Sequence, residues 1–192
     1  EVLALKPYSI LVATGSNVIS IPLEGLDQVQ TVQAHDVLAN DMQFANKKVV
    51  VIGGGITGLE TALYINRQGT NQVSVVDMLP EWPVDMLDMR YQNEALLEVR
   101  HCNDQGVALF YNNKVVKFAD GKLFTESTKD GEVKELPADV IVLSVGVKPN
   151  DALWQELLAS GHPSVWKAGD AIATGKINKA VLHGSKFGYS LN

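Results

Sequence analysis

The strongest constraint on the fold is a glycine-rich segment that stands between an apolar run and a helical pattern. Residues 53–60 read Gly-Gly-Gly-Ile-Thr-Gly-Leu-Glu and directly follow the apolar run Val49–Ile52. The helical pattern extends from Ile56 to about Gln68, and a second apolar run occupies Val73–Val76. Strand, helix and strand in this order are typical of a parallel βαβ unit, and such apolar strands are typical of a sheet covered on both faces. The predicted fold is therefore α/β, a three-layer Rossmann-like domain with a parallel sheet.

The glycines of this segment have separate physical roles in a dinucleotide site. Gly53 permits the tight turn out of the strand, Gly55 lets a pyrophosphate approach the backbone, and Gly58 lets the helix pack close to the sheet. The N–H groups of the helix N-terminus then hold the diphosphate. The residues predicted to form this site are Gly53, Gly54, Gly55, Ile56, Thr57 and Gly58. The alternative is a glycine-rich turn that holds no ligand.

An aspartate at the end of the second apolar run indicates which dinucleotide is bound. Asp77 follows Gly53 by 24 residues, close to the roughly 20-residue offset at which an acid meets the adenosine ribose. A carboxylate there accepts hydrogen bonds from the ribose hydroxyls and repels a 2′-phosphate. No arginine directly follows Asp77, so we expect NAD(H) rather than NADP(H). The alternative is a solvated aspartate that caps the next segment.

Further patterns are predicted to complete the same domain. A short helix is expected at His35–Leu38 and a long one at Met89–Asn103, with Cys102 on its apolar face. Four shorter runs, with Asp-Gly pairs at two of their junctions, predict an antiparallel meander. These runs are Val107–Tyr111, Lys114–Phe118, Lys122–Thr125 and Val133–Leu136. The buried strand Val140–Leu143 should then rejoin the main sheet, and a closing helix begins near Asn178.

Composition argues against several other classes of protein. The net charge is −6 and no lysine or arginine run stands out, so a nucleic-acid partner is not expected. No apolar run approaches the roughly 20 residues that span a bilayer, and the N-terminus lacks the features of a signal peptide. Together these features predict a cytoplasmic protein. Because the chain does not begin with Met, we interpret it as a piece of a longer protein.

Few other side chains point to chemistry on their own. Cys102 is the single cysteine, which excludes an internal disulfide or a paired-cysteine redox centre in this sequence. We expect it to be a buried core thiol. Glu60, from composition alone, is a solvated surface acid, and the three tryptophans are expected to be packing residues. The four histidines are scattered, so no metal ligand is assigned.

Several motifs, taken in order, resemble the pyridine nucleotide–disulfide oxidoreductase superfamily, in which an NAD-binding domain is inserted into an FAD-binding domain. Ile10–Gly15 resembles the apolar strand ending in Ala-Thr-Gly that closes the first FAD segment. Residues 53–60 resemble the glycine motif of the inserted domain, and Leu143–Gly146 resembles the strand and turn that leave it. Trp166–Asp170 is similar to the late Gly-Asp motif.

The resemblance implies roles for further residues and a division into domains. It implies that Glu60 lies near the nicotinamide side and that Asp170 contacts the ribityl-phosphate region of the flavin. The cofactor-binding residues that it adds are Ala13, Thr14, Gly15, Glu60, Gly146, Gly169 and Asp170. Residues 1–30 and 161–192 are then expected to be remnants of the FAD domain, with residues 31–160 forming the NAD-binding domain.

The C-terminal segment is similar to one branch of this superfamily, the NADH:flavin oxidoreductases of the 2,4-dienoyl-CoA reductase, 2-enoate reductase and trimethylamine dehydrogenase type. That similarity rests on Gly169–Ala171, Gly175–Ile177, Ala180 and Gly184. It implies an FMN domain and an iron–sulfur cluster upstream in the same polypeptide. It also implies that NADH delivers hydride to FAD, from which electrons pass on to FMN and substrate.

Two alternatives to this function stay open in the sequence. The first is a fragment of an NADH oxidase or of a ferredoxin-reductase-like flavoprotein. The second is a structural module that holds ADP and performs no chemistry. Because the family's first glycine loop has no counterpart here, we expect FAD to be held by the full-length protein, and we do not expect this segment to be active alone.

Overall fold

The computed structural model describes residues 1–80 and 92–191. By internal contacts the chain forms two compact units. The first contains residues 1–19 and 146–192, and the second contains residues 20–145. The three-part division at residues 30 and 160 stays a prediction about domains, and each compact unit is described by itself.

The second unit is built on a parallel sheet in which every neighbouring pair of strands runs in the same direction. Its strand order is β3-β10-β4-β5-β6. The strands are β3 (Gln30–Gln33), β10 (Val140–Leu143), β4 (Lys48–Ile52), β5 (Gln72–Val76) and β6 (Ala108–Phe110). The predicted βαβ unit is confirmed, because β4 and β5 are adjacent and parallel, with Val49 opposite Val73.

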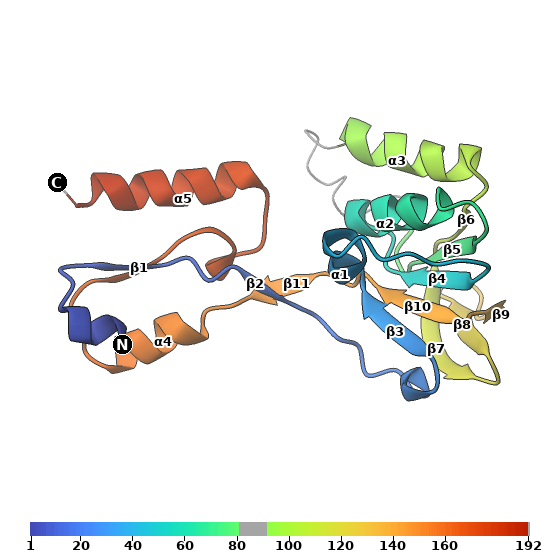
Figure 1. Ribbon diagram of the computed structural model, residues 1–192, viewed down its shortest axis with the longest axis horizontal. Helices are drawn as coiled ribbons and strands as arrows, with labels where there is room; N and C mark the ends of the chain where they lie inside the picture. Colours follow the sequence, from blue (N-terminus) through green and yellow to red (C-terminus); the bar gives the residue numbers. More distant parts are fainter. Residues whose placement is uncertain (81–91, 192) are drawn as a thin grey trace. The chain divides into compact units, whose positions relative to one another are not determined.

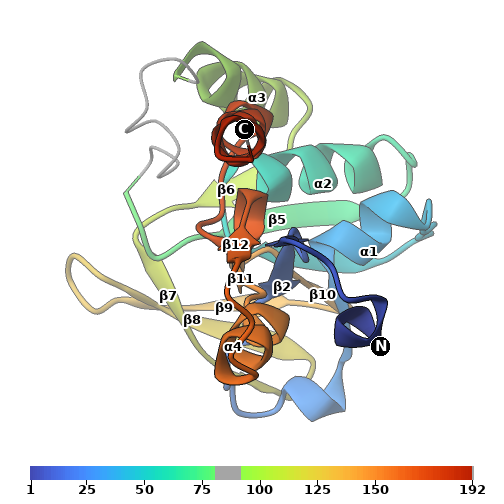
Figure 2. The same ribbon diagram turned by 90° about the vertical axis from the view of Figure 1, so that its left-hand side faces the viewer.

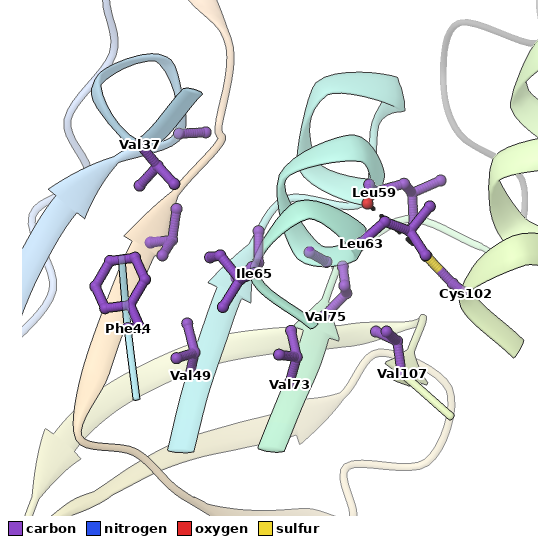
Figure 3. Packing of buried hydrophobic residues seen from close by; sticks show 14 of the residues in the cluster. Val37, Phe44, Val49, Leu59, Leu63, Ile65, Val73, Val75, Cys102 and Val107 are labelled. Carbon is purple, nitrogen blue, oxygen red and sulfur yellow. Dashed lines mark hydrogen bonds between the residues drawn. The ribbon is translucent and has the colours of Figure 1, made fainter. Parts of the chain in front are cut away.

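Three helices cover one face of this sheet (Figure 1). They are α1 (Ala34–Ala39), α2 (Ile56–Asn66) and α3 (Gln92–Asp104). Val49 of β4 points into the core beneath them, where Leu59 of α2 and Cys102 of α3 are fully buried (Figure 3). Val51 of the same strand belongs to this core. Cys102 is therefore the core thiol expected from its place on the helix. The first residues of the helix predicted at 89–103 lie outside the described residues.

An antiparallel meander covers the other face of the sheet (Figure 2). Its strands are β7 (Asn113–Ala119), β8 (Lys122–Ser127) and β9 (Val133–Pro137). Val50 and Ile52, which alternate with the helix-facing residues of β4, pack in a second core with Phe118 and Leu123 of the meander. Helices, parallel sheet and meander are thus three layers, as predicted from the sequence.

One predicted strand belongs to a different layer from the one expected. The run Val107–Tyr111 was assigned to the meander, but β6 pairs in parallel with β5, with Val75 opposite Leu109. That assignment is wrong because a short alternating run does not reveal its partner, and β5 offered a free edge. β3 was not predicted, since its Gln-Thr-Val-Gln sequence has none of the apolar continuity of the central strands.

The described residues of the first unit contain two small pairs of strands and two α-helices, with short 3-10 helices at Val2–Leu5 and Gly169–Ala171. β1 (Ile10–Val12) pairs in parallel with β12 (Val165–Lys167), and β2 (Ser16–Val18) pairs antiparallel with β11 (Val147–Pro149). The β1–β12 pair lies between α4 (Ala152–Ala159) and α5 (Ile177–Tyr189) in both views (Figures 1 and 2). Ile10 and Val12 pack against Leu157 of α4.

The predicted packing role of the tryptophans holds for one of the two described. Trp154 packs against the buried cluster of the first unit, and the Lys167 ammonium lies 4.0 Å from its ring centroid. Trp166 is 44% exposed, with its ring edge toward Phe187. Trp82 lies outside the described residues. In the part of the chain that the structure describes, no helix is both long enough and apolar enough to cross a membrane.

Candidate dinucleotide site

The turn from β4 into α2 requires glycine at its first position. Gly53 adopts φ +111°, which is unfavourable for residues with a side chain. A Cβ atom there would lie 2.2 Å from the carbonyl oxygen of Ser144. The backbone amide of Gly53 donates to the Val76 carbonyl at 2.8 Å. Gly53 is therefore hydrogen-bonded to the neighbouring strand at the point where the turn begins.

Gly58 brings the first turn of α2 against this loop. A Cβ atom at Gly58 would lie 2.0 Å from the carbonyl oxygen of Gly53, a backbone atom that cannot rotate away. The helix N-terminus is therefore held directly over the end of β4. This position favours an anion in the space above, because the helix dipole and the unpaired N–H groups converge there.

Gly55 is the residue from which α2 starts. Its φ of −70° and ψ of 173° are open to any residue, so the backbone alone does not demand glycine. No side chain among the described residues caps this end of the helix. Ile56 is buried and Thr57 is exposed. The first N–H groups of α2 thus form a place where an anion can be bound.

Asp77 is joined to the glycine loop by its side chain. One carboxylate oxygen, Oδ2, accepts the Gly54 amide at 2.6 Å, and the other, Oδ1, accepts the Leu79 amide at 2.8 Å. Asp77 is half-buried and directly follows β5. The structure therefore brings the predicted ribose acid to the predicted phosphate loop, and it also shows the local capping bond named as the alternative.

Tyr111 is a neighbour of this loop that the sequence did not identify. A Cβ atom at Gly54 would lie 3.0 Å from Cε1 of Tyr111 and 3.2 Å from Cβ of Asp77. Tyr111 directly follows β6, at the carboxyl edge of the same parallel sheet. Correct placement of β6 would have revealed it, since residues that follow parallel strands gather at this edge.

Glu60 lies about one turn after the start of α2, and its side chain is exposed, as expected from composition. Glu60 lines a cavity of about 640 Å³ between α2, α3 and the loop after α1. The other residues that line this cavity are Asp41, Gln43, Leu63, Tyr64, Arg67, Gln68, Glu98 and His101. Among the described residues, no member of the glycine loop lines it, so a nicotinamide-side role for Glu60 stays a prediction.

The remaining predicted residues gather in the first unit. Thr14 and Gly15 follow β1, and both are hydrogen-bonded to Asn150. The Thr14 hydroxyl donates to the Asn150 carbonyl, and the backbone amide of Asn150 donates to the Gly15 carbonyl at 3.0 Å. Gly169 and Asp170 follow β12, the parallel neighbour of β1. Ala13 is exposed in the same segment as Thr14.

The carboxylate of Asp170 is held on two sides. Its Oδ1 accepts the Gly175 amide at 3.1 Å and its Oδ2 accepts the Ser16 hydroxyl at 3.5 Å. Gly146, at φ +92°, accepts the Ile19 amide beside β11. Two groups of candidate residues thus form, a glycine loop with Asp77 in the second unit and a carboxyl-edge cluster around Asp170 in the first.

Comparison with known proteins identifies the class to which this fold and site belong. The chain matches the pyridine nucleotide-disulphide oxidoreductase family over residues 4–184. It therefore belongs to that family, whose matched relatives are oxidoreductases.

Three similar proteins illustrate the range of that family. The NADH oxidase of Thermoanaerobacter brockii is 31% identical over 98% of this chain and 28% of its own length. The bilirubin reductase of Mediterraneibacter gnavus is 34% identical over 78% of this chain and 22% of its own. A 2-naphthoyl-CoA reductase structure shares the fold with a TM-score of 0.80 at 24% identity, covering 96% of this chain and 27% of that one. The chain thus spans less than a third of each of these proteins.

Proposed function

We propose that this chain is the NADH-binding module of a flavin-dependent oxidoreductase. The observation that carries the proposal is the bond between Asp77 and the Gly54 amide, which joins a ribose-binding acid to a phosphate-binding loop. The module positions the nicotinamide for hydride transfer to FAD. The protein supplies placement and electrostatics for that reaction.

The residues of the loop fit a dinucleotide at its diphosphate. The uncapped N-terminus of α2 supplies N–H donors and a positive dipole end, so it needs no cationic side chain. Gly55 leaves the backbone open to close approach. The function of Gly53 and Gly58 is to hold that backbone in place, because neither position has room for a side chain.

The carboxylate of Asp77 fits the adenosine ribose of NADH. Each of its oxygens accepts one backbone N–H, and a carboxylate has about four acceptor sites in all. The remaining sites are available to the two ribose hydroxyls. A 2′-phosphate would instead meet a negative charge that is fixed in place by two hydrogen bonds, and this disfavours NADPH.

FAD is the second cofactor that the family implies, and the cluster around Asp170 fits part of it. Thr14, Gly15, Gly169 and Asp170 follow two adjacent parallel strands, the edge at which α/β folds bind nucleotides. The half-buried Asp170 carboxylate is an acceptor suited to the hydroxyls of a ribityl chain. When bound, FAD supplies the acceptor for the hydride. These residues would hold and orient it together with parts of the full-length protein.

We assign the full-length protein to the branch that includes 2,4-dienoyl-CoA reductase, 2-enoate reductase and trimethylamine dehydrogenase. This is supported by the C-terminal sequence from Gly169 to Gly184 and by a relative named cinnamate reductase, since cinnamate is a 2-enoate. The upstream partners would then be an FMN domain and an iron–sulfur cluster. A second candidate, an NADH oxidase, is favoured by the relative of that name in Thermoanaerobacter brockii.

The proposal is tested by two measurements on the purified protein. Titration with NADH and with ADP should show tighter binding of NADH, because the nicotinamide half also makes contacts. In the flavin-loaded full-length protein, anaerobic NADH should bleach the flavin absorbance. Binding of ADP with no gain for NADH, and no bleaching, would instead favour the structural module. Rapid reoxidation by oxygen alone would favour the NADH oxidase.

A further inference from the structure

The corner that joins β6 to β7 carries a buried polar side chain beside the proposed NADH site. Asn113 is 6% exposed and its partner Thr125 is fully buried. An amide removed from water needs hydrogen-bond partners, because leaving its donors and acceptors unpaired destabilises the fold. The hydrogen-bond partners of Asn113 show which segments of the chain it connects.

Asn113 holds three segments at once. Its side-chain Nδ2 donates to the Tyr111 carbonyl at 2.7 Å, and its Oδ1 accepts the Thr125 hydroxyl at 3.4 Å. Its backbone amide donates to the Asp77 carbonyl at 2.8 Å. One residue therefore connects the meander strand β8, the residue that follows β6 and the residue that follows β5.

Further backbone bonds lay this corner against the turn that begins at Asp77. The Asp77 amide donates to the Phe110 carbonyl at 2.9 Å, and the Asn112 amide donates to the Leu79 carbonyl at 2.8 Å. Asn112 adopts φ +57°, a left-handed conformation that asparagine tolerates better than most residues. The backbone of Asp77 is thus set by the corner rather than by β5 alone.

The same corner sets the ring of Tyr111 beside the glycine loop. The ring edge and Cβ of Asp77 lie 3.0 Å and 3.2 Å from the point that a Cβ of Gly54 would occupy. Both groups therefore flank Gly54. A shift of the corner by a few tenths of an ångström would move both of them relative to the loop.

We propose that Asn113 is a positioning residue for the dinucleotide: through the backbone of Tyr111 and Asp77 it fixes the carboxylate that recognises the adenosine ribose. The inference rests on the proposed function. It assigns to the meander a part in cofactor selectivity, because Asn113 is the first residue of the meander strand β7.

The test compares two buried variants that break different ends of this connection. Asn113→Leu removes the donor to the Tyr111 carbonyl and should lower NADH affinity about tenfold, the equivalent of a misplaced hydrogen bond to a charged group. NADPH affinity should change much less, so the ratio of the two falls. The matched control, Thr125→Val, is also buried and also loses stability. It keeps the Asn113–Tyr111 bond and should keep the ratio.

The readout is the ratio of NADH affinity to NADPH affinity, which is the NADPH dissociation constant divided by that of NADH, in folded variants, with thermal unfolding as the check on structure. An unchanged ratio in Asn113→Leu, or an equal fall in Thr125→Val, would overturn the inference. If Asn113→Leu does not fold, Asn113→Ala also lacks a side-chain donor and decides on the same ratio. Absence of NADH binding in the unaltered protein would instead overturn the proposed function itself, and with it this inference.

Discussion

The carboxylate of Asp77 accepts a hydrogen bond from the Gly54 amide at 2.6 Å. The acid that follows β5 is therefore bonded to the glycine loop that follows the neighbouring strand, β4. The ribose-binding group and the phosphate-binding loop are therefore oriented before any ligand arrives. Preorganisation of this kind lowers the cost of binding, because fewer groups must be ordered in the complex. Substitution of Asp77 affects the loop as well as the ribose contact, and an informative variant must keep an acceptor for Gly54.

Gly58→Ala should destabilise the protein by about 1–3 kcal/mol, since the new methyl group would press on the carbonyl of Gly53. Gly184→Ala in α5 is a matched control, because nothing lies within 4 Å of its added Cβ. A helical glycine-to-alanine change in open space stabilises by about 0.4–1 kcal/mol. Urea denaturation of both variants measures the difference. Equal stability of the two would contradict the close packing of α2.

The elements near Gly58 were predictable because their signals are local. The strand before Gly53, the helix after Gly55 and the acid at Asp77 are encoded within one short stretch of sequence. Glycine at positions 53 and 58 reports steric constraints that any parallel βαβ turn of this kind imposes. Three-layer architecture followed from the apolar strands, which require cover on both faces.

The features that were predicted wrongly or missed depend on contacts between segments far apart in the sequence. Val107–Tyr111 has the alternation of a meander strand, and only the free edge of β5 makes it a parallel strand. The roles of Tyr111 and Asn113 were missed for the same reason, because Tyr111 lies beside Gly54 and Asn113 donates to Asp77, contacts between segments far apart in the sequence. β3, whose ends are two glutamines, gives no sequence signal of a sheet edge.

Gly55→Val should abolish NADH binding and leave the fold intact. Its backbone angles suit any residue, and the added side chain would oppose the approach of the pyrophosphate. The measurements are an NADH titration and a thermal unfolding curve on the same preparation. A folded Gly55→Val protein with unchanged NADH affinity would show that the loop does not hold the diphosphate.

Cys102 should make the protein less stable at alkaline pH. Burial, with a smaller contribution from the charge of Glu98, raises the pKa of the Cys102 thiol from 9.0 to about 12. Between these values the unfolded chain loses the thiol proton and the folded protein retains it. The free energy of unfolding therefore falls as pH rises above about 9, by up to about 1.4 kcal/mol per pH unit from this group.

Urea unfolding at pH 8 and pH 10 measures this effect, with Cys102→Ala as the reference that lacks the thiol. The difference in stability between the two proteins should narrow at the higher pH. A thiol reagent should also modify the native protein slowly, because the side chain is fully buried. A constant difference between the two pH values, or rapid modification, would contradict the buried thiol.

The most direct test of the account is the ratio of NADH to NADPH affinity in the unaltered protein and in Asp77→Asn. Asparagine keeps a carbonyl oxygen for the Gly54 amide and removes the charge that repels a 2′-phosphate. The unaltered protein should bind NADH about tenfold to a hundredfold more tightly than NADPH, the equivalent of about 1.5–3 kcal/mol, and Asp77→Asn should lose most of that preference. A ratio that stays the same in a folded Asp77→Asn protein would contradict the assignment of Asp77 to the ribose and the proposal of an NADH site.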